Sequence, residues 1–192
     1  QSRSSAASDV YKRQAKDLGL TSRMQIVAPN LTQSIVEQAG PGLMEGVVGT
    51  EPWTWRVPEL ENSAPGKAFV KAYSERYAMY PSSSAASAYS IVQQWADAAK
   101  RAGSLDSEAL IKALEGHSYA LLKDRQQWRS FDHQNIQTVY AVKVKPRAEV
   151  LKDPLKQDYF EIVERLDGGT GLPDLATWQT ERRNAGQPLA LQ

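Results

Sequence analysis

YPSSSAASAYSIVQQWADAAKRAG, residues 80 to 103, is the stretch on which the fold prediction depends. Its small and apolar side chains recur at steps of three and four, a period that places them on one face of a helix. That face holds Ala85, Tyr89, Val92, Ala96, Ala99 and Ala102, with Trp95 beside them. Pro81 and the serines after it predict the start of the helix, and Gly103 predicts its end. Because most of the face is alanine, we expect the helix to lie close against a sheet.

Strand-like runs lie on both sides of this helix. Upstream, two short apolar runs, 24–28 (MQIVA) and 45–50 (EGVVGT), enclose a short helix that Thr32 can cap. A strand, a helix and a strand within about 25 residues form a βαβ unit, so these two strands should be parallel. Downstream, strands are expected at 138–144 (TVYAVKV) and 159–163 (YFEIV). The sequence therefore predicts an α/β fold with parallel sheets flanked by helices.

The composition excludes some classes of function and selects none. The 192 residues include 23 basic and 22 acidic residues and no cysteine. The balanced charge gives no support for nucleic-acid binding, and the lack of cysteine excludes disulfides and thiol chemistry. No apolar run reaches the length of a membrane helix, and we recognise no signal peptide.

We interpret the first residues of the chain as having a different origin from the rest. The run SSAASDVYKRQ, residues 4 to 14, reads as the in-frame translation of a transposase-type sequencing-library adapter. We therefore expect residues 1–14 to be a non-native segment outside the fold. On this interpretation the gene product begins near Ala15, within an open reading frame.

Polar and aromatic residues follow the two upstream strands. Asn30 and Thr32 come after the first strand, and Thr50, Trp53 and Trp55 come at the end of the second. In open α/β sheets, ligands bind at the carboxyl ends of the strands. We therefore expect the asparagine and the threonines to hydrogen-bond a small polar solute, and the tryptophans to line the site or close over it. A structural role, as loop residues and a packed aromatic pair, is the alternative.

Other polar clusters do not support catalysis or metal binding. Asp132 and His133 stand side by side, but adjacent side chains cannot easily face one metal ion, and no second histidine lies near. We expect these two residues and Gln134 to satisfy backbone groups at a sheet edge. The serines at 82–84 lack a nucleophile elbow, and GGTG (168–171) lacks the strand and helix of a phosphate loop. We therefore predict no catalytic residue, no metal and no cofactor.

Three stretches, taken in order, resemble one protein family. The first is EGVVGTEPWTW (45–55) with the helix pair of 64–116, the second is WRSFDHQNIQTVYAVKVK (128–145), and the third is DYFEIVERLDG (158–168). Together they are similar to the type I periplasmic binding proteins, and more narrowly to the branched-chain amino acid and amide receptors of ABC transporters. The resemblance covers most of the chain from Ala15 to Gly168.

The resemblance implies an incomplete receptor with two α/β lobes joined by several crossing strands, from which roughly the first half is absent. It divides the chain into a partial C-terminal lobe, a partial N-terminal lobe, a return to the C-terminal lobe and a tail: 15–56, 57–145, 146–168 and 169–192. It also implies a small solute held between the lobes, a membrane permease as partner and a periplasmic location. Near Asn30 the amino acid receptors carry an acidic residue that holds the ligand's ammonium group. Asparagine here favours amides or urea-like solutes over a plain α-amino acid.

Two other interpretations of the sequence stay open. A cytoplasmic regulator could use the same fold to sense amides, and the chain could be a non-catalytic fragment of an α/β enzyme. The second interpretation would require a nucleophile or an acid–base pair in this chain, and none stands out.

Overall fold

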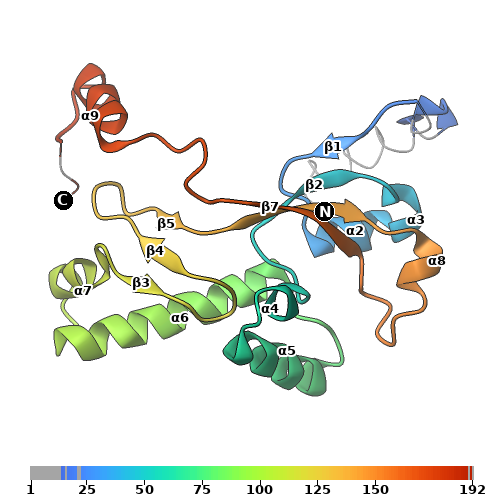
Figure 1. Ribbon diagram of the computed structural model, residues 1–192, viewed down its shortest axis with the longest axis horizontal. Coiled ribbons are helices and arrows are strands. Elements are labelled where there is room, and N and C mark those ends of the chain that lie inside the picture. Colours follow the sequence, from blue (N-terminus) through green and yellow to red (C-terminus); the bar gives the residue numbers. More distant parts are fainter. Residues whose placement is uncertain (1–13, 16, 21–22, 190, 192) are drawn as a thin grey trace.

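The computed structural model describes residues 14–15, 17–20, 23–189 and 191, so all of the proposed adapter segment except Gln14 lies outside the described residues. Figure 1 shows two parts joined by extended segments. The first part is built on a four-stranded sheet, and the second contains the longer helices and a small three-stranded sheet. No helix in the described part of the chain combines the length and the apolarity needed to cross a bilayer.

The four-stranded sheet has the order β1-β2-β6-β7. Its strands are β1 (Val27–Ala28), β2 (Val48–Glu51), β6 (Val139–Val144) and β7 (Phe160–Leu166). β1 and β2 pair in parallel, as the βαβ pattern predicts, whereas β2 with β6 and β6 with β7 pair in antiparallel. The expectation of parallel sheets therefore holds only for the first pair. The chain leaves the sheet at the end of β2 and re-enters it there as β6, so β6 must run back alongside β2.

Short helices complete the first part. α2 (Gln33–Ala39) begins at Thr32, whose side chain accepts a hydrogen bond from the backbone N–H of Ile35. α3 (Pro41–Met44) follows it, and α8 (Arg147–Val150) lies between β6 and β7. Buried apolar residues of the sheet, the loops and the helices pack together: Leu31, Val36, Met44, Val47, Val142, Val144, Val150 and Phe160.

The second part begins with helices and ends with a small sheet. The helices are α4 (Val57–Leu60), α5 (Ala64–Tyr77), α6 (Ser83–Ala102) and α7 (Ser107–Leu114). The strands are β3 (Ser118–Tyr119), β4 (Gln126–Trp128) and β5 (Asn135–Ile136), all antiparallel. Figure 1 shows α6 running alongside this sheet.

α6 begins and ends at the residues that the sequence predicts. The side of the helix that is buried differs from the predicted one. Ser82 caps the helix by accepting a hydrogen bond from the backbone N–H of Ala85, and Gly103 ends it with a φ of 61°. The buried residues are Ser83, Ala86, Gln94 and Ala98. On the predicted face, Tyr89, Val92 and Trp95 are 39%, 61% and 49% exposed. Tyr89 meets the Phe69 ring of α5, with 4.7 Å between the centroids, and the sheet that we expected against this face is not among the described elements.

Extended segments cross between the two parts after β2, between β5 and β6, and after β7. Because β6 pairs with β2 and β7, residues 139–144 belong to the sheet of the first part, whereas the expected division of the chain placed them with 57–145. The apolar pattern of a strand does not reveal which sheet the strand joins. Two crossing segments lie in close contact, since a Cβ atom on Gly168 would be 1.8 Å from the carbonyl oxygen of Gln137.

The segment after the last crossing contains a further helix. α9 (Leu175–Asn184) is a helix capped by Asp174. Its Trp178 ring lies 5.5 Å from the Phe131 ring, and Arg129 Nη1 donates to the carbonyl oxygen of Pro173 at 3.0 Å. These contacts tie residues 173–184 to the second part of the molecule.

Candidate functional site

The carboxyl ends of β1 and β2 form a polar edge, as the sequence predicts. The backbone N–H of Leu31 donates to the carbonyl oxygen of Thr50 at 3.1 Å, which places the two loops side by side. Asn30 is exposed and has a φ of 57°, a left-handed conformation that asparagine tolerates better than most residues. Thr50 is exposed as well, and Thr32 is half-buried at the start of α2. The loops that carry the three residues therefore lie side by side, although some twenty positions separate Thr50 from Asn30 and Thr32 in the sequence.

A close approach of backbone and side chains fixes this edge. At Gly49, a Cβ atom would lie 2.3 Å from the carbonyl oxygen of Ala28 and 2.4 Å from Leu31 Cβ. Only glycine fits there without moving the loop that carries Asn30. The position of the loop relative to Thr50 therefore depends on a residue without a side chain.

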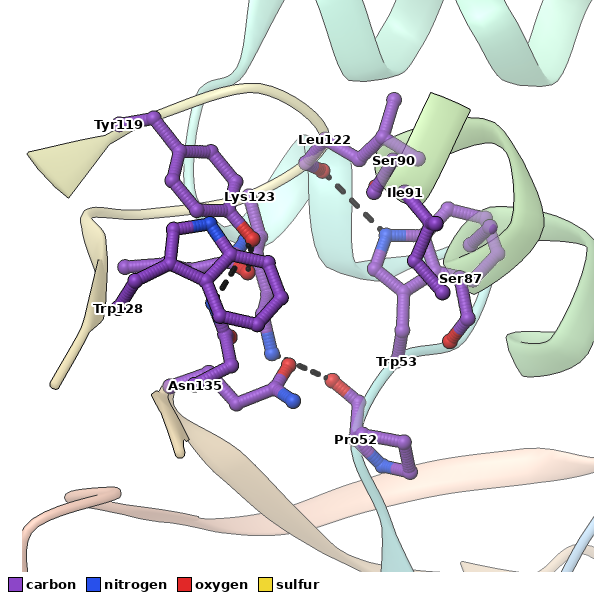
Figure 2. Close-up of a pocket in the computed structure, with 13 residues that line it drawn as sticks. Pro52, Trp53, Ser87, Ser90, Ile91, Tyr119, Leu122, Lys123, Trp128 and Asn135 are labelled. Atoms are coloured by element: carbon purple, nitrogen blue, oxygen red, sulfur yellow. Dashed lines mark hydrogen bonds between the residues drawn. The ribbon is translucent and has the colours of Figure 1, made fainter. Parts of the chain in front are cut away.

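Trp53 lies away from that edge, in the second part of the molecule. It is only 4% exposed, and its indole Nε1 donates to the carbonyl oxygen of Leu122 at 3.3 Å (Figure 2). Its ring also packs edge-on against Phe69, with 6.1 Å between the ring centroids. Its ring is buried and engaged, so it is not placed to close over the polar edge.

Trp55 is held by its own neighbours. Its ring stacks on Tyr80 with 3.9 Å between the centroids, and the Arg56 guanidinium lies 4.2 Å from its centroid on a face of the ring. The five residues singled out from the sequence thus divide into a polar edge of three and two separately packed tryptophans.

A cavity of about 180 Å³ lies beside Trp53, between α6 and the three-stranded sheet. Figure 2 shows it lined by side chains from α6, from the β3–β4 hairpin and from the crossing segments. Its polar groups bond mainly to each other: Tyr119 donates its hydroxyl to Gln126 Oε1 at 2.8 Å and accepts from Asn135 Nδ2 at 3.0 Å. The cavity therefore borders the junction of the two parts, and among its described lining residues Trp128 has a buried indole Nε1 without a hydrogen-bond partner.

Lys123 fastens two of the crossing segments. Its ammonium group donates to the carbonyl oxygen of Pro52 at 2.7 Å and to that of Thr138 at 2.6 Å. Burial lowers the pKa of Lys123 to about 8, although nearby Asp124 and Glu61 act in the opposite direction. A buried amine with a lowered pKa can serve catalysis, but these two bonds give this one a structural role.

Glu51 is a residue that the sequence-based prediction missed. It ends β2 beside the exposed Thr50, yet it is only 1% exposed. Burial raises its pKa to about 7, while a hydrogen bond with Ser83 acts to lower it. Strand alternation was the available signal, because neighbouring residues of a strand face opposite sides.

Of the polar cluster 132–134, Asp132 satisfies a backbone group as we expected, whereas the His133 side chain does not. Arg129 Nε donates to Asp132 Oδ1 at 2.8 Å, and the same carboxylate oxygen accepts the backbone N–H of Gln134 at 3.2 Å. His133 points elsewhere, with its Nε2 2.8 Å from Glu115 Oε1. Within the described residues, no group of three or more metal-ligating side chains comes together.

The arrangement defines a class of binding protein. Two α/β parts joined by crossing segments, with a polar edge at parallel strand ends, are typical of proteins that hold a small solute. A family described as periplasmic binding protein matches residues 11–149, which is most of the chain. The chain therefore belongs to the periplasmic binding protein family, whose members bind solutes and are not enzymes. Comparison with curated protein sequences found no match.

Solved structures share the fold. An amino acid ABC transporter substrate-binding protein from Pseudomonas fluorescens Pf-5 is 24% identical, with a TM-score of 0.75 over 92% of this chain and 44% of its own. A branched-chain amino acid ABC transporter periplasmic ligand-binding protein from Burkholderia xenovorans LB400 is 21% identical, with a TM-score of 0.75 over 89% of this chain and 44% of its own. A solute-binding protein from Rhodopseudomonas palustris BisB5, solved with 3,4-dihydroxybenzoic acid, is 21% identical, with a TM-score of 0.64 over 83% of this chain and 42% of its own. This chain thus spans less than half of the length of each, and the resemblance to type I periplasmic binding proteins is confirmed.

Proposed function

We propose that this chain is the C-terminal part of the substrate-binding component of an ABC importer. The complete receptor would act in the periplasm, capture a small polar solute between two lobes and present it to a membrane permease. The solute would be a branched-chain amino acid, an amide or a urea-like compound. Support comes from the family and from the related structures, which are transporter receptors for amino acids and other ligands.

The polar edge is the observation that carries the proposal. Asn30 and Thr50 are exposed there, and the bond between Leu31 and Thr50 holds their loops together. Hydroxyl and amide groups can both donate and accept hydrogen bonds, which suits a neutral polar solute. Asn30 carries no charge, so the edge offers no carboxylate at that position to a ligand's ammonium group. The chemistry therefore favours an amide or urea-like solute.

Calorimetry on the full-length receptor tests this proposal. Acetamide, urea and L-leucine are titrated into the unchanged receptor and into a Thr50→Val variant, which keeps the shape of the side chain and removes the hydroxyl. We expect the variant to lose about tenfold in affinity, the usual effect of one hydrogen bond. Thr180→Val, on the exposed side of α9, is the matched control and should bind normally.

The Asn30→Asp variant tests the charge argument. Aspartate also tolerates the left-handed backbone and adds the carboxylate that asparagine lacks. It should strengthen binding of L-leucine relative to acetamide by about tenfold. If neither substitution changes the affinity for any of the three compounds, the polar edge is not the solute site.

A further inference from the structure

The segment of residues 151–158, here called the strap, reaches from the first part of the molecule to the second. It connects α8 to β7 and lies against the connection between α5 and α6 (Figure 1). Tyr80 in that connection makes two bonds to it. Its backbone N–H donates to Gln157 Oε1 at 2.9 Å, and its hydroxyl donates to Asp153 Oδ1 at 2.8 Å.

A charged group closes the strap at its other end. Arg56, from the second part, donates to both carboxylate oxygens of Asp158, at 3.2 Å and 2.7 Å. Lys145, which follows β6, lies 2.5 Å from the same carboxylate. Burial acts to raise the pKa of Asp158, but hydrogen bonds from Arg56 and Lys145 hold it below its ordinary value. Asp158 therefore stays ionised and joins cations from both parts.

The strap is shaped before it meets the second part. Asp153 Oδ2 accepts the backbone N–H groups of Leu155 at 3.1 Å and of Gln157 at 3.2 Å. Lys156 has a φ of 56°, which turns the chain back. This internal bonding leaves Asp153 Oδ1 and the Gln157 side chain directed at Tyr80. The strap can therefore bind the second part without a further loss of conformational entropy.

A second set of bonds between the parts lies at the opposite end of β6 and β7. Tyr140 and Arg165 pair across these strands, and both donate to Glu61 Oε1, each at 2.9 Å. At the other end, Val144 pairs with Phe160, next to the strap. Tyr140 and Val144 are four residue steps apart along β6, which is about 13 Å. Two anchors at that spacing prevent rotation of one part against the other, whereas a single anchor permits it.

We propose that the strap is a releasable tie that holds the two parts in the arrangement seen here. Its bonds to the second part are polar, and the Arg56 side chain is 48% exposed whereas that of Asp158 is 8% exposed, so water reaches this ion pair from the arginine side. Release leaves two groups of contacts as the pivot: the bonds that Glu61 accepts, and the ion pair of Arg165 with Asp124 beside them. If the proposed receptor function is right, this tie shifts the equilibrium between the open and closed arrangements of the two lobes. The strap is distant in sequence from the polar edge.

Spin labels measure the effect without any solute, so the result is independent of the proposed function. The sequence contains no cysteine, and therefore Gln38→Cys on α2 and Lys112→Cys on α7 give two specific labels, both at exposed positions. Double electron–electron resonance should give one narrow distance distribution for the doubly labelled chain. Tyr80→Phe combined with Gln157→Ala should broaden it or add a second, shifted peak.

The controls separate release from misfolding. Tyr80→Phe keeps the ring that stacks on Trp55, and circular dichroism and the melting temperature report whether the fold is kept. Lys152→Ala lies in the strap with an exposed side chain and should leave the distribution unchanged. An unchanged, narrow distribution in the folded Tyr80→Phe and Gln157→Ala variant would overturn the proposal, as would equal broadening in the Lys152→Ala control.

Discussion

Thr50 and Glu51 are adjacent residues of β2 with opposite environments. Thr50 is exposed at the polar edge, and Glu51 is buried beneath α6 beside Ser83. One strand end therefore supplies both a candidate solute contact and a buried carboxyl group. Because the carboxyl group of Glu51 is buried, its protonation is coupled to the stability of the fold.

Glu51 should make the protein less stable as the pH rises from about 4.5 to about 7. The folded protein retains the Glu51 proton up to the higher value, whereas the unfolded chain loses it at the lower one. The free energy of unfolding should therefore fall across this window, by on the order of 3 kcal/mol in full. Urea denaturation at several pH values measures the slope, and Glu51→Gln should reduce it. If the free energy of unfolding of Glu51→Gln changes with pH as it does in the unchanged chain, Glu51 is not the group responsible. Glu161→Gln, at an exposed position on β7, is the control.

Trp53 should matter for stability instead of closing over a solute. Its ring is buried against Phe69 and its indole N–H bonds to Leu122. Trp53→Ala should therefore lower the free energy of unfolding by about 3–5 kcal/mol in denaturant titrations. Trp95→Ala removes a ring that is 49% exposed and should cost less than about 1 kcal/mol. Equal effects of the two substitutions would show that Trp53 is not part of the core.

The polar edge could be predicted from the sequence, and the tryptophans could not. Asn30, Thr32 and Thr50 follow from one local rule, that parallel neighbouring strands end at the same edge. The position of Trp53 depends on Leu122, which lies 69 residues away. No local pattern encodes a contact at that separation.

At the scale of elements, the ends of helices are better predicted than their faces. Ser63, Ser82 and Asp106 cap α5, α6 and α7 through the residue types that capping requires. The sequence also shows which residues of α6 form an apolar face. It does not show whether that face is buried, because burial needs a second surface, and the described elements leave Tyr89, Val92 and Trp95 exposed.

That exposed side of α6 should cause self-association of the isolated chain. Val92 and Trp95 lie one turn apart with Ile91 and Tyr89 next to them, and all four are exposed. An apolar patch of this kind favours contact with another copy. Val92→Glu should raise the concentration at which oligomers form by roughly tenfold, as measured by light scattering after gel filtration. Gln93→Glu adds the same charge at a neighbouring exposed position, and an equal effect there would point to charge instead of the apolar surface.

At the scale of the molecule, connectivity decides what composition and periodicity leave open. The existence of β6 and β7 could be predicted from their apolar runs. Their antiparallel pairing and their membership in the first sheet depend on where the crossing segments return the chain. The close contact of Gly168 with Gln137 shows how tightly those crossings pack. Such contacts between distant segments are set by the whole fold and leave little trace in a single sequence.

The size of the chain leads to the last prediction. It spans less than half of the receptors that share its fold, and its polar edge comes from one side of one sheet. A solute bound there would keep much of its surface in water, whereas small-molecule sites bury most of the ligand. We therefore expect calorimetry of the isolated chain to show no binding of acetamide, urea or L-leucine up to about 1 mM. The full-length receptor should bind at least one of these compounds with a dissociation constant about a hundredfold below that concentration. A cooperative thermal transition of the isolated chain excludes unfolding as the cause. Micromolar binding by the isolated chain would show instead that the edge of β1 and β2 is a sufficient site by itself.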